Sequence, residues 1–276
     1  WYERLQLRGY TQVRYNRLGA TNPHLKNDQG DKSIGDSGGF LVRRARLILR
    51  GEIAPFLGIY IQPEFASALQ DSLNIGQLRD LYGDIFLNRD KEFRFRVGQQ
   101  KVPYGFELMQ SSSNRLPFDR SDALNSAFVN ERDLGAFFMF EPVSVRKRLR
   151  HLSDSGLKGS GDYGMVATGI TNGQPLNTRE RNDNKHFFAR ITYPFEIGSQ
   201  TLEIAGGGYT GLFVVPSLAE GITTAQKDIR DLRMHATFVL YPQPFGLQAE
   251  YNAGVGPELD GKVVRDTSPG SGGHHG

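Results

Sequence analysis

The feature that most constrains this chain is a period-two alternation of side chains that returns in segment after segment. In residues 4–16 the even positions are mostly basic or polar, and the odd positions are mostly apolar. In residues 93–100, Arg94 and Arg96 alternate with Phe93, Phe95 and Val97. Successive side chains of a β-strand point to opposite faces, so this pattern predicts strands with one apolar and one cationic face.

Eleven segments of this kind are expected to form strands. They are residues 4–16, 40–51, 56–65, 78–87, 93–100, 134–141, 163–171, 186–195, 201–213, 229–241 and 245–253. The segments 134–141 and 163–171 alternate poorly, so their facing stays open.

The connections between these segments alternate between long and short. The long ones are 18–39, 66–76, 102–132, 172–185 and 212–228, and the short ones are 52–55, 88–91, 196–200 and 242–244. Long loops at one end and short turns at the other are typical of a transmembrane β-barrel. The chain is therefore predicted to be all-β, one antiparallel transmembrane barrel domain over residues 1–276. The connection 142–162 is long where a short turn is expected, and no structure is predicted for it.

The strand count bears on whether the barrel is complete. Eleven or twelve strands can be counted, and residues 267–276 are rich in Gly, Ser and His and are expected to form a loop. Bacterial single-chain barrels have an even number of strands and no free edge. We therefore expect further C-terminal strands outside this sequence.

Composition excludes several other classes of protein. Hydrophobic residues make up 38%, and the sequence holds no apolar run of the length that a spanning helix needs. The net charge of +3 is too small to indicate a nucleic-acid partner. The six His have no metal-binding spacing apart from the adjacent terminal pair, and Cys is absent. We expect no catalytic site, no metal and no cofactor. A secreted β-sandwich binding module stays open as an alternative, although its strands would be shorter and its outer face polar.

Alternation places a set of basic and polar side chains in the water-filled interior, because each Arg or Lys on the lipid face near the bilayer midplane costs about 2–4 kcal/mol. The predicted lining residues of the strands are Arg8, Arg14, Arg44, Arg46, Arg50, Tyr60, Asp80, Arg94 and Arg96. Residues 102–132 are long enough to fold inward as a constriction loop, with Lys101, Arg115 and Arg120, or else to lie outside. The arginines either attract anions or pair with acids such as Glu64, Asp80 and Asp84 to stiffen the wall. Phe187, Tyr193, Phe195, Tyr241 and Phe245 lie near strand ends and fit aromatic girdles or contacts between subunits.

Residues 93–120, FRFRVGQQKVPYGFELMQSSSNRLPFDR, resemble the phosphate-selective porins of the O and P type. The residues that carry the match are Gly98, Lys101, Pro103, Glu107, Ser112, Ser113 and Phe118. The similarity continues in FLVRRARLILRGEI (40–53), RDLG (132–135), YGMVATGITNG (163–173), NDNKHFFARITYPF (182–195) and FGLQAEYNAG (245–254).

This resemblance implies a homotrimer of barrels with about 16 strands each. It further implies an outer-membrane location in contact with lipid and lipopolysaccharide, and a signal peptide already removed. The implied function is the passage of small inorganic or organic anions, phosphate among them, guided by Arg and Lys. A weakly selective general porin or an organic-anion porin remains the alternative.

Overall fold

The computed structural model describes residues 2–17, 38–69, 72–115, 119–121, 131–174, 176–214 and 228–256. A single 3-10 turn, η1 (Tyr2–Arg4), precedes the first strand. The strands are β1 (Leu5–Asn16), β2 (Gly39–Ala54), β3 (Leu57–Leu69), β4 (Ser72–Phe86), β5 (Phe93–Lys101), β6 (Arg132–Phe140), β7 (Val166–Thr171), β8 (His186–Ile197), β9 (Gln200–Phe213), β10 (Ile229–Leu240) and β11 (Leu247–Val255).

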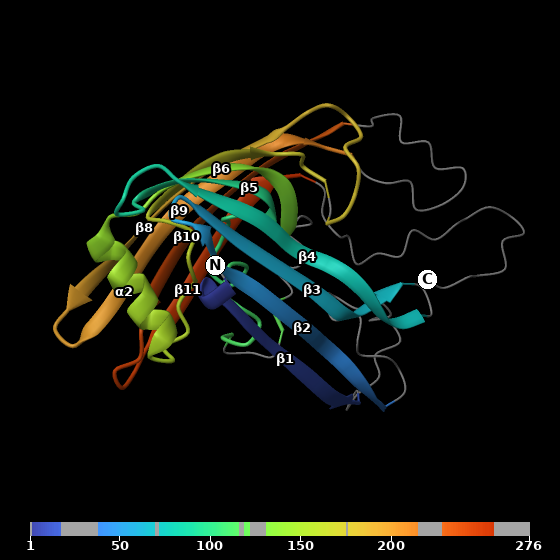
Figure 1. The fold of residues 1–276 in the computed structure, drawn as a ribbon, viewed down its shortest axis with the longest axis horizontal. Helices are drawn as coiled ribbons and strands as arrows, with labels where there is room; N and C mark the ends of the chain where they lie inside the picture. Colours follow the sequence, from blue (N-terminus) through green and yellow to red (C-terminus); the bar gives the residue numbers. More distant parts are fainter. Residues whose placement is uncertain are drawn as a thin grey trace, which may run out of the picture.

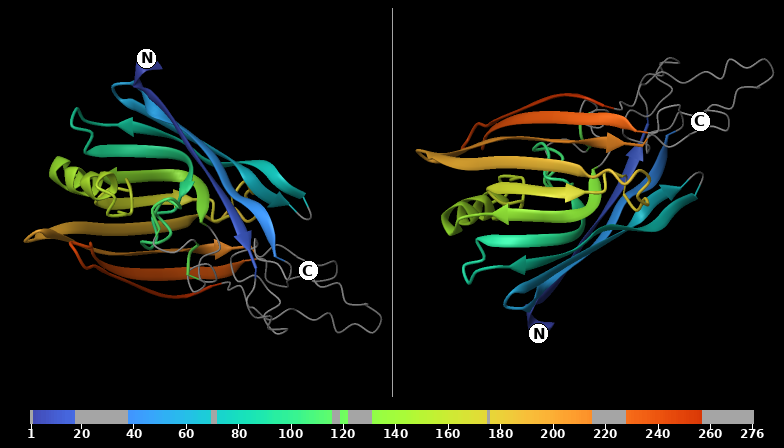
Figure 2. Two further views of the ribbon diagram at one scale, coloured as in Figure 1. Left: turned by 90° about the horizontal axis from the view of Figure 1, so that it is seen from below. Right: turned by 90° about the horizontal axis from the view of Figure 1, so that it is seen from above.

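All eleven strands form one antiparallel sheet in sequence order, from β1 to β11. The sheet twists and curls around an interior (Figures 1 and 2). The predicted all-β antiparallel fold is confirmed, and one continuous sheet excludes the alternative of two stacked sheets. Closure into a barrel of about 16 strands stays a prediction. No helix among these residues is long and apolar enough to cross a bilayer.

The two faces of the sheet differ as the alternation demands. On the outer face Leu81 and Val97 are 45% and 53% exposed, whereas on the inner face Asp80 and Arg96 are 5% and 3% exposed. Exposed apolar side chains in this number are costly in water but suit contact with acyl chains. The inner face therefore holds the charged residues.

Several register shifts interrupt the pairing of the described strands, and two of them are bulges that place an arginine. The pairing of β1 with β2 shifts so that Arg43 is skipped between Val42 and Arg44. The pairing of β3 with β4 shifts at Pro63, and Arg79 is skipped there. Proline cannot donate to the ladder of hydrogen bonds, which gives the second bulge a physical cause. A bulge re-aims the side chains next to it, and each bulge here adds an arginine beside an inward-facing charged residue.

The connection 142–162, for which no structure was predicted, contains the helix α2 (Val143–Asp154). Its buried side chains, Val145, Leu149 and Leu152, recur at helical spacing and pack against Phe106, Val239 and Tyr241. Arg146 of α2 donates to the backbone oxygens of Lys91 and Asp90 in the turn between β4 and β5, at 2.7 and 2.6 Å. The helix thus lies at the short-turn end of the sheet (Figure 1). Tyr241, expected in an aromatic girdle or in contacts between subunits, is only 1% exposed because it packs in this cluster.

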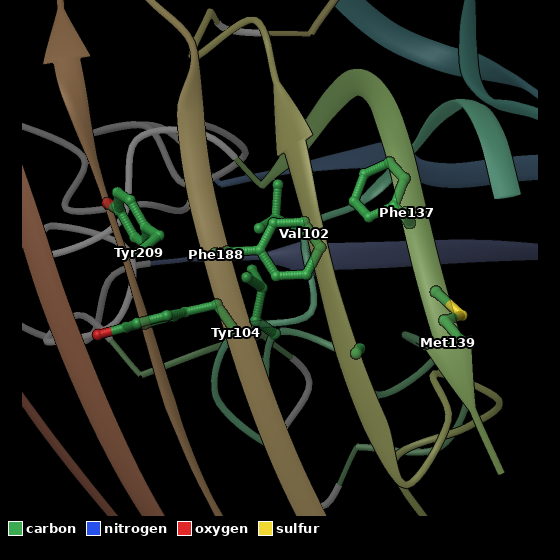
Figure 3. Close-up of a cluster of buried hydrophobic side chains, with 8 residues drawn as sticks. Val102, Tyr104, Phe137, Met139, Phe188 and Tyr209 are labelled. Carbon is green, nitrogen blue, oxygen red and sulfur yellow. The ribbon is translucent and has the colours of Figure 1, made fainter. Parts of the chain in front are cut away.

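A second apolar cluster lies on the inner face of the sheet. Its members are Val102, Tyr104, Leu108, Phe137, Met139, Ala167, Phe188 and Tyr209 (Figure 3). The first three belong to the connection after β5, and the others project inward from β6, β7, β8 and β9. Burial of these side chains therefore draws residues 102–115 onto the inner face (Figure 2).

Candidate functional site

Residues 102–115 are fastened to β11 by a carboxylate. Glu250 accepts hydrogen bonds from the backbone N–H groups of Phe106 and Glu107, at 2.8 and 3.1 Å. Gly105 has a φ of +65°, and a Cβ at this position would lie 2.3 Å from Oε1 of Glu250. Glycine is required here for both reasons.

The same connection contacts β1 and β2 further along. Arg46 donates to the Ser112 hydroxyl at 2.8 Å, and Tyr10 is hydrogen-bonded to the same hydroxyl. Asp119 pairs with three arginines of these strands, which are Arg14, Arg43 at 3.1 Å and Arg44 at 2.8 Å. One loop carboxylate thus ties the connection to β1 and β2.

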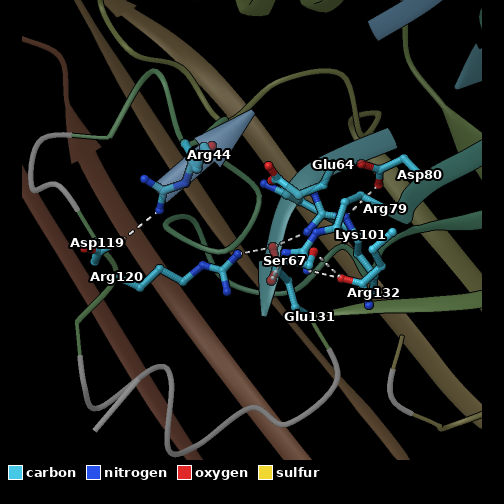
Figure 4. A network of polar contacts seen from close by, with 12 residues as sticks. Arg44, Glu64, Ser67, Arg79, Asp80, Lys101, Asp119, Arg120, Glu131 and Arg132 are labelled. Carbon is cyan, nitrogen blue, oxygen red and sulfur yellow. Dashed lines mark hydrogen bonds and ion pairs between the residues drawn. The ribbon is translucent and has the colours of Figure 1, made fainter. Parts of the chain in front are cut away.

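Among the described residues, an excess of positive charge lies where the connection leaves β5 and returns to β6. Figure 4 shows four basic side chains of this cluster, Arg79, Lys101, Arg120 and Arg132, with the carboxylates Asp80 and Glu131. Arg115 belongs to the same cluster, where the charges of Arg120, Glu131 and Glu107 act on it. Arg132 pairs with Asp80 at 2.9 Å, and Glu131 is shared by Arg79 at 3.1 Å, by Arg120 and by Arg132.

Two cations of this cluster have no carboxylate within ion-pair distance among the described residues. Lys101 donates to the backbone oxygens of Met109 and Gln110, at 3.2 and 2.6 Å, so one of its three donors is unused. Arg115 is 9% exposed, and its buried Nε has no partner. An anion would supply the missing acceptors.

The electrostatics of the loop residues agree with this charge balance. Burial, and after it the neighbouring Arg120, lowers the pKa of Arg115 to about 9. Burial alone would raise the pKa of Glu131, but Arg120, Arg132 and Arg79 outweigh it and hold that pKa well below its ordinary value. The cluster therefore stabilises negative charge.

Other arginines of the wall are paired with carboxylates. Arg96 donates to both oxygens of Asp84, at 2.6 and 2.8 Å, and Arg94 pairs with Asp162. Arg46 pairs with Glu64. Such pairs hold the buried guanidinium groups in place and cancel their charge, as the stiffening interpretation of these arginines expects.

The predicted lining residues thus divide into three groups. Arg44, Arg46, Asp80, Arg94 and Arg96 are buried and paired, and Arg14 is half-buried and paired. Lys101 and Arg115 lie in the cationic cluster. Arg8 and Arg50 are exposed, and Tyr60 stacks on Tyr82.

Several charged residues of the site were not among the predicted lining residues. They include Arg43, Arg79, Asp119, Glu131 and Arg132. The two bulges place Arg43 and Arg79, and the folding of the loop places Asp119 and Glu131. Only Pro63, opposite the second bulge, gives a signal in the sequence.

Comparison with known proteins gives one family and two solved structures. The sequence profile described as phosphate-selective porin O and P matches residues 22–270. The outer membrane channel DcaP of Acinetobacter baumannii is similar in fold, with a TM-score of 0.52 and 14% sequence identity over 93% of this chain. The chain spans 66% of the length of that channel. OmpT, an outer membrane protein of Vibrio cholerae in its trimer form, matches with a TM-score of 0.32 and 11% identity over 93% of this chain and 90% of its own. No curated protein sequence matches.

The family match covers most of the chain, and it agrees with the motifs around Gly98, Lys101 and Pro103. It confirms the prediction that the protein is not an enzyme, and it places the protein in the outer membrane. The chain belongs to the phosphate-selective porin O and P family.

Proposed function

We propose that this chain forms the wall and the constriction of an outer-membrane diffusion channel for small anions of the phosphate type. The observation that carries the proposal is the excess of cations where the inward connection leaves β5 and returns to β6. There, Lys101 and Arg115 have no carboxylate partner among the described residues. A row of cations replaces the hydration that an anion loses in a narrow pore. Arginine suits phosphate because its planar guanidinium holds two oxygens at once.

The constriction is proposed to be residues 102–132, of which the described part lies against the inner face. Its fastening to β1, β2, β5, β10 and β11 would narrow the lumen at the level of the cationic cluster. An anion on its way through would pass Lys101 and Arg115. The apolar outer face supports contact with lipid and lipopolysaccharide. We further propose a homotrimer whose signal peptide is removed on export.

The double variant Lys101→Gln/Arg115→Gln tests this proposal. Hydrogen bonds to charged groups contribute about 1.5–3 kcal/mol each, so the loss of two of them should weaken the block of the chloride current by phosphate at least about a hundredfold. The reversal potential in a KCl gradient should also shift toward cations. The control Lys147→Gln/Arg150→Gln removes the same charge from exposed positions of α2. Equal phosphate block in the wild type and the first variant would refute the proposed site.

A weakly selective channel is the second candidate. The observation that favours it is the pairing of Arg46, Arg94 and Arg96 with carboxylates. The reversal potential of the wild-type channel separates the two candidates, because a weakly selective channel gives a value near zero.

A further inference from the structure

A row of residues in register crosses the first six strands on the wall of the proposed channel, and its four side chains face inward. In register across the strands it runs through Gln6, Arg50, Tyr60, Tyr82, Gly98 and Gly135. Directly opposite side chains on neighbouring strands have their Cβ atoms about 4.5–5.5 Å apart and therefore interact. The proposed anion cluster at Lys101 and Arg115 does not use Arg50, Tyr60 or Tyr82.

The two tyrosines of this row form a preorganised flat surface. Their rings are parallel within 3°, with centroids 4.9 Å apart. The guanidinium of Arg96 lies 4.0 Å from the centre of the Tyr82 ring and is itself held by both oxygens of Asp84. The hydroxyl of Tyr60 donates to Gln62 at 2.8 Å. One face of the Tyr60 ring is covered by Tyr82, and the other is directed toward β2.

Arg50 is the residue of β2 that pairs in register with Tyr60. It is exposed, and its polar contacts among the described residues are two long hydrogen bonds, both at 3.4 Å, to the side-chain oxygen of Gln6. No carboxylate of the described chain lies within ion-pair distance of it. Its guanidinium therefore has donors available beside an aromatic face.

We infer that Arg50 and the Tyr60–Tyr82 stack bind flat organic anions, in particular aromatic carboxylates, at a subsite separate from the cationic cluster. The carboxylate of the ligand accepts two hydrogen bonds from the guanidinium of Arg50, and the aromatic ring of the ligand lies against Tyr60. Phosphate has no flat face and gains only the charge interaction. The subsite therefore distinguishes aromatic from compact or saturated anions. The inference rests on the proposed channel function, because the ligand reaches this wall through the lumen.

Benzoate and cyclohexanecarboxylate provide the test, since they share charge and approximate size and only benzoate is flat. Each is titrated against the chloride current of single channels in planar lipid bilayers. Stacking on an aromatic ring should make benzoate block about three- to tenfold more strongly than cyclohexanecarboxylate. Tyr60→Leu should abolish this preference, and Arg50→Gln should weaken block by both acids.

Arg8→Gln is the matched control. Arg8 is an exposed arginine on the same face, and its cross-strand partner is Ile48 rather than an aromatic residue. This variant should keep the benzoate preference. Equal block by the two acids in the wild type, or a benzoate preference that survives in Tyr60→Leu, would overturn the subsite. Either result can occur in a channel that still selects anions, whereas a reversal potential without anion preference would count against the proposed function instead.

Discussion

Two anchors hold the inward connection near Phe106, and their relative strength predicts how the channel responds to mutation. Phe106 is 1% exposed and packs against α2 and Tyr241. Truncation of a buried Phe to Ala costs about 3–5 kcal/mol. The two N–H groups that bond to Glu250 contribute about 1.5–3 kcal/mol each. The apolar anchor and the polar anchor are therefore comparable.

We expect Phe106→Ala to keep the connection in place, because the bonds to Glu250 remain. The loss of Phe106 raises the ratio of released to held connection by a factor of about a hundred to a few thousand. Because this ratio is very small in the wild type, the held state still predominates. The double variant Phe106→Ala/Glu250→Ala loses both anchors and should release the connection. Single-channel conductance should therefore rise in the double variant much more than in either single variant.

Conductance in planar bilayers measures this effect, and gel mobility of unheated samples checks that each variant is folded. Lys147→Ala, on the exposed side of α2, is the control and should conduct like the wild type. The reasoning is wrong if Phe106→Ala alone conducts as well as the double variant. It is also wrong if the folded double variant conducts like the wild type.

Two further predictions concern stability in detergent. Asp84→Asn leaves the buried guanidinium of Arg96 without its charged partner and should lower the free energy of unfolding by about 3–5 kcal/mol; Asp183→Asn, at an exposed position, should leave the melting temperature unchanged. Burial, and after it Asp162, raises the pKa of Glu141 to about 7. The folded protein then holds a proton that the unfolded chain releases near pH 4.3, so stability should fall as the pH rises from about 4.3 to about 7. Melting temperatures across this range should be flatter in Glu141→Gln, and an identical slope in both proteins would contradict the assignment.

The strands were predictable because a half-lipid, half-water environment forces alternation on every strand. The segment 93–100 shows this most clearly, and β5 ends one residue later, at Lys101. Helix α2 was not predicted, although Val145, Leu149 and Leu152 have helical spacing. The bulge at Arg43 left no sign in the sequence. Loop partners such as Asp119 could not be assigned, because their positions depend on how the whole connection folds.

The charge pattern of the wall explains why pairing and transport can coexist in one sheet. A buried arginine without a partner is costly, so a chain that relied on unpaired cations alone would lose stability. Arg94 and Arg96 avoid this cost through Asp162 and Asp84, and their field is largely cancelled. Lys101 instead uses backbone oxygens of the inward connection, which fix the ammonium group without neutralising it. We therefore expect anion preference to depend on how residues 102–115 are held, and much less on the total number of arginines in the wall.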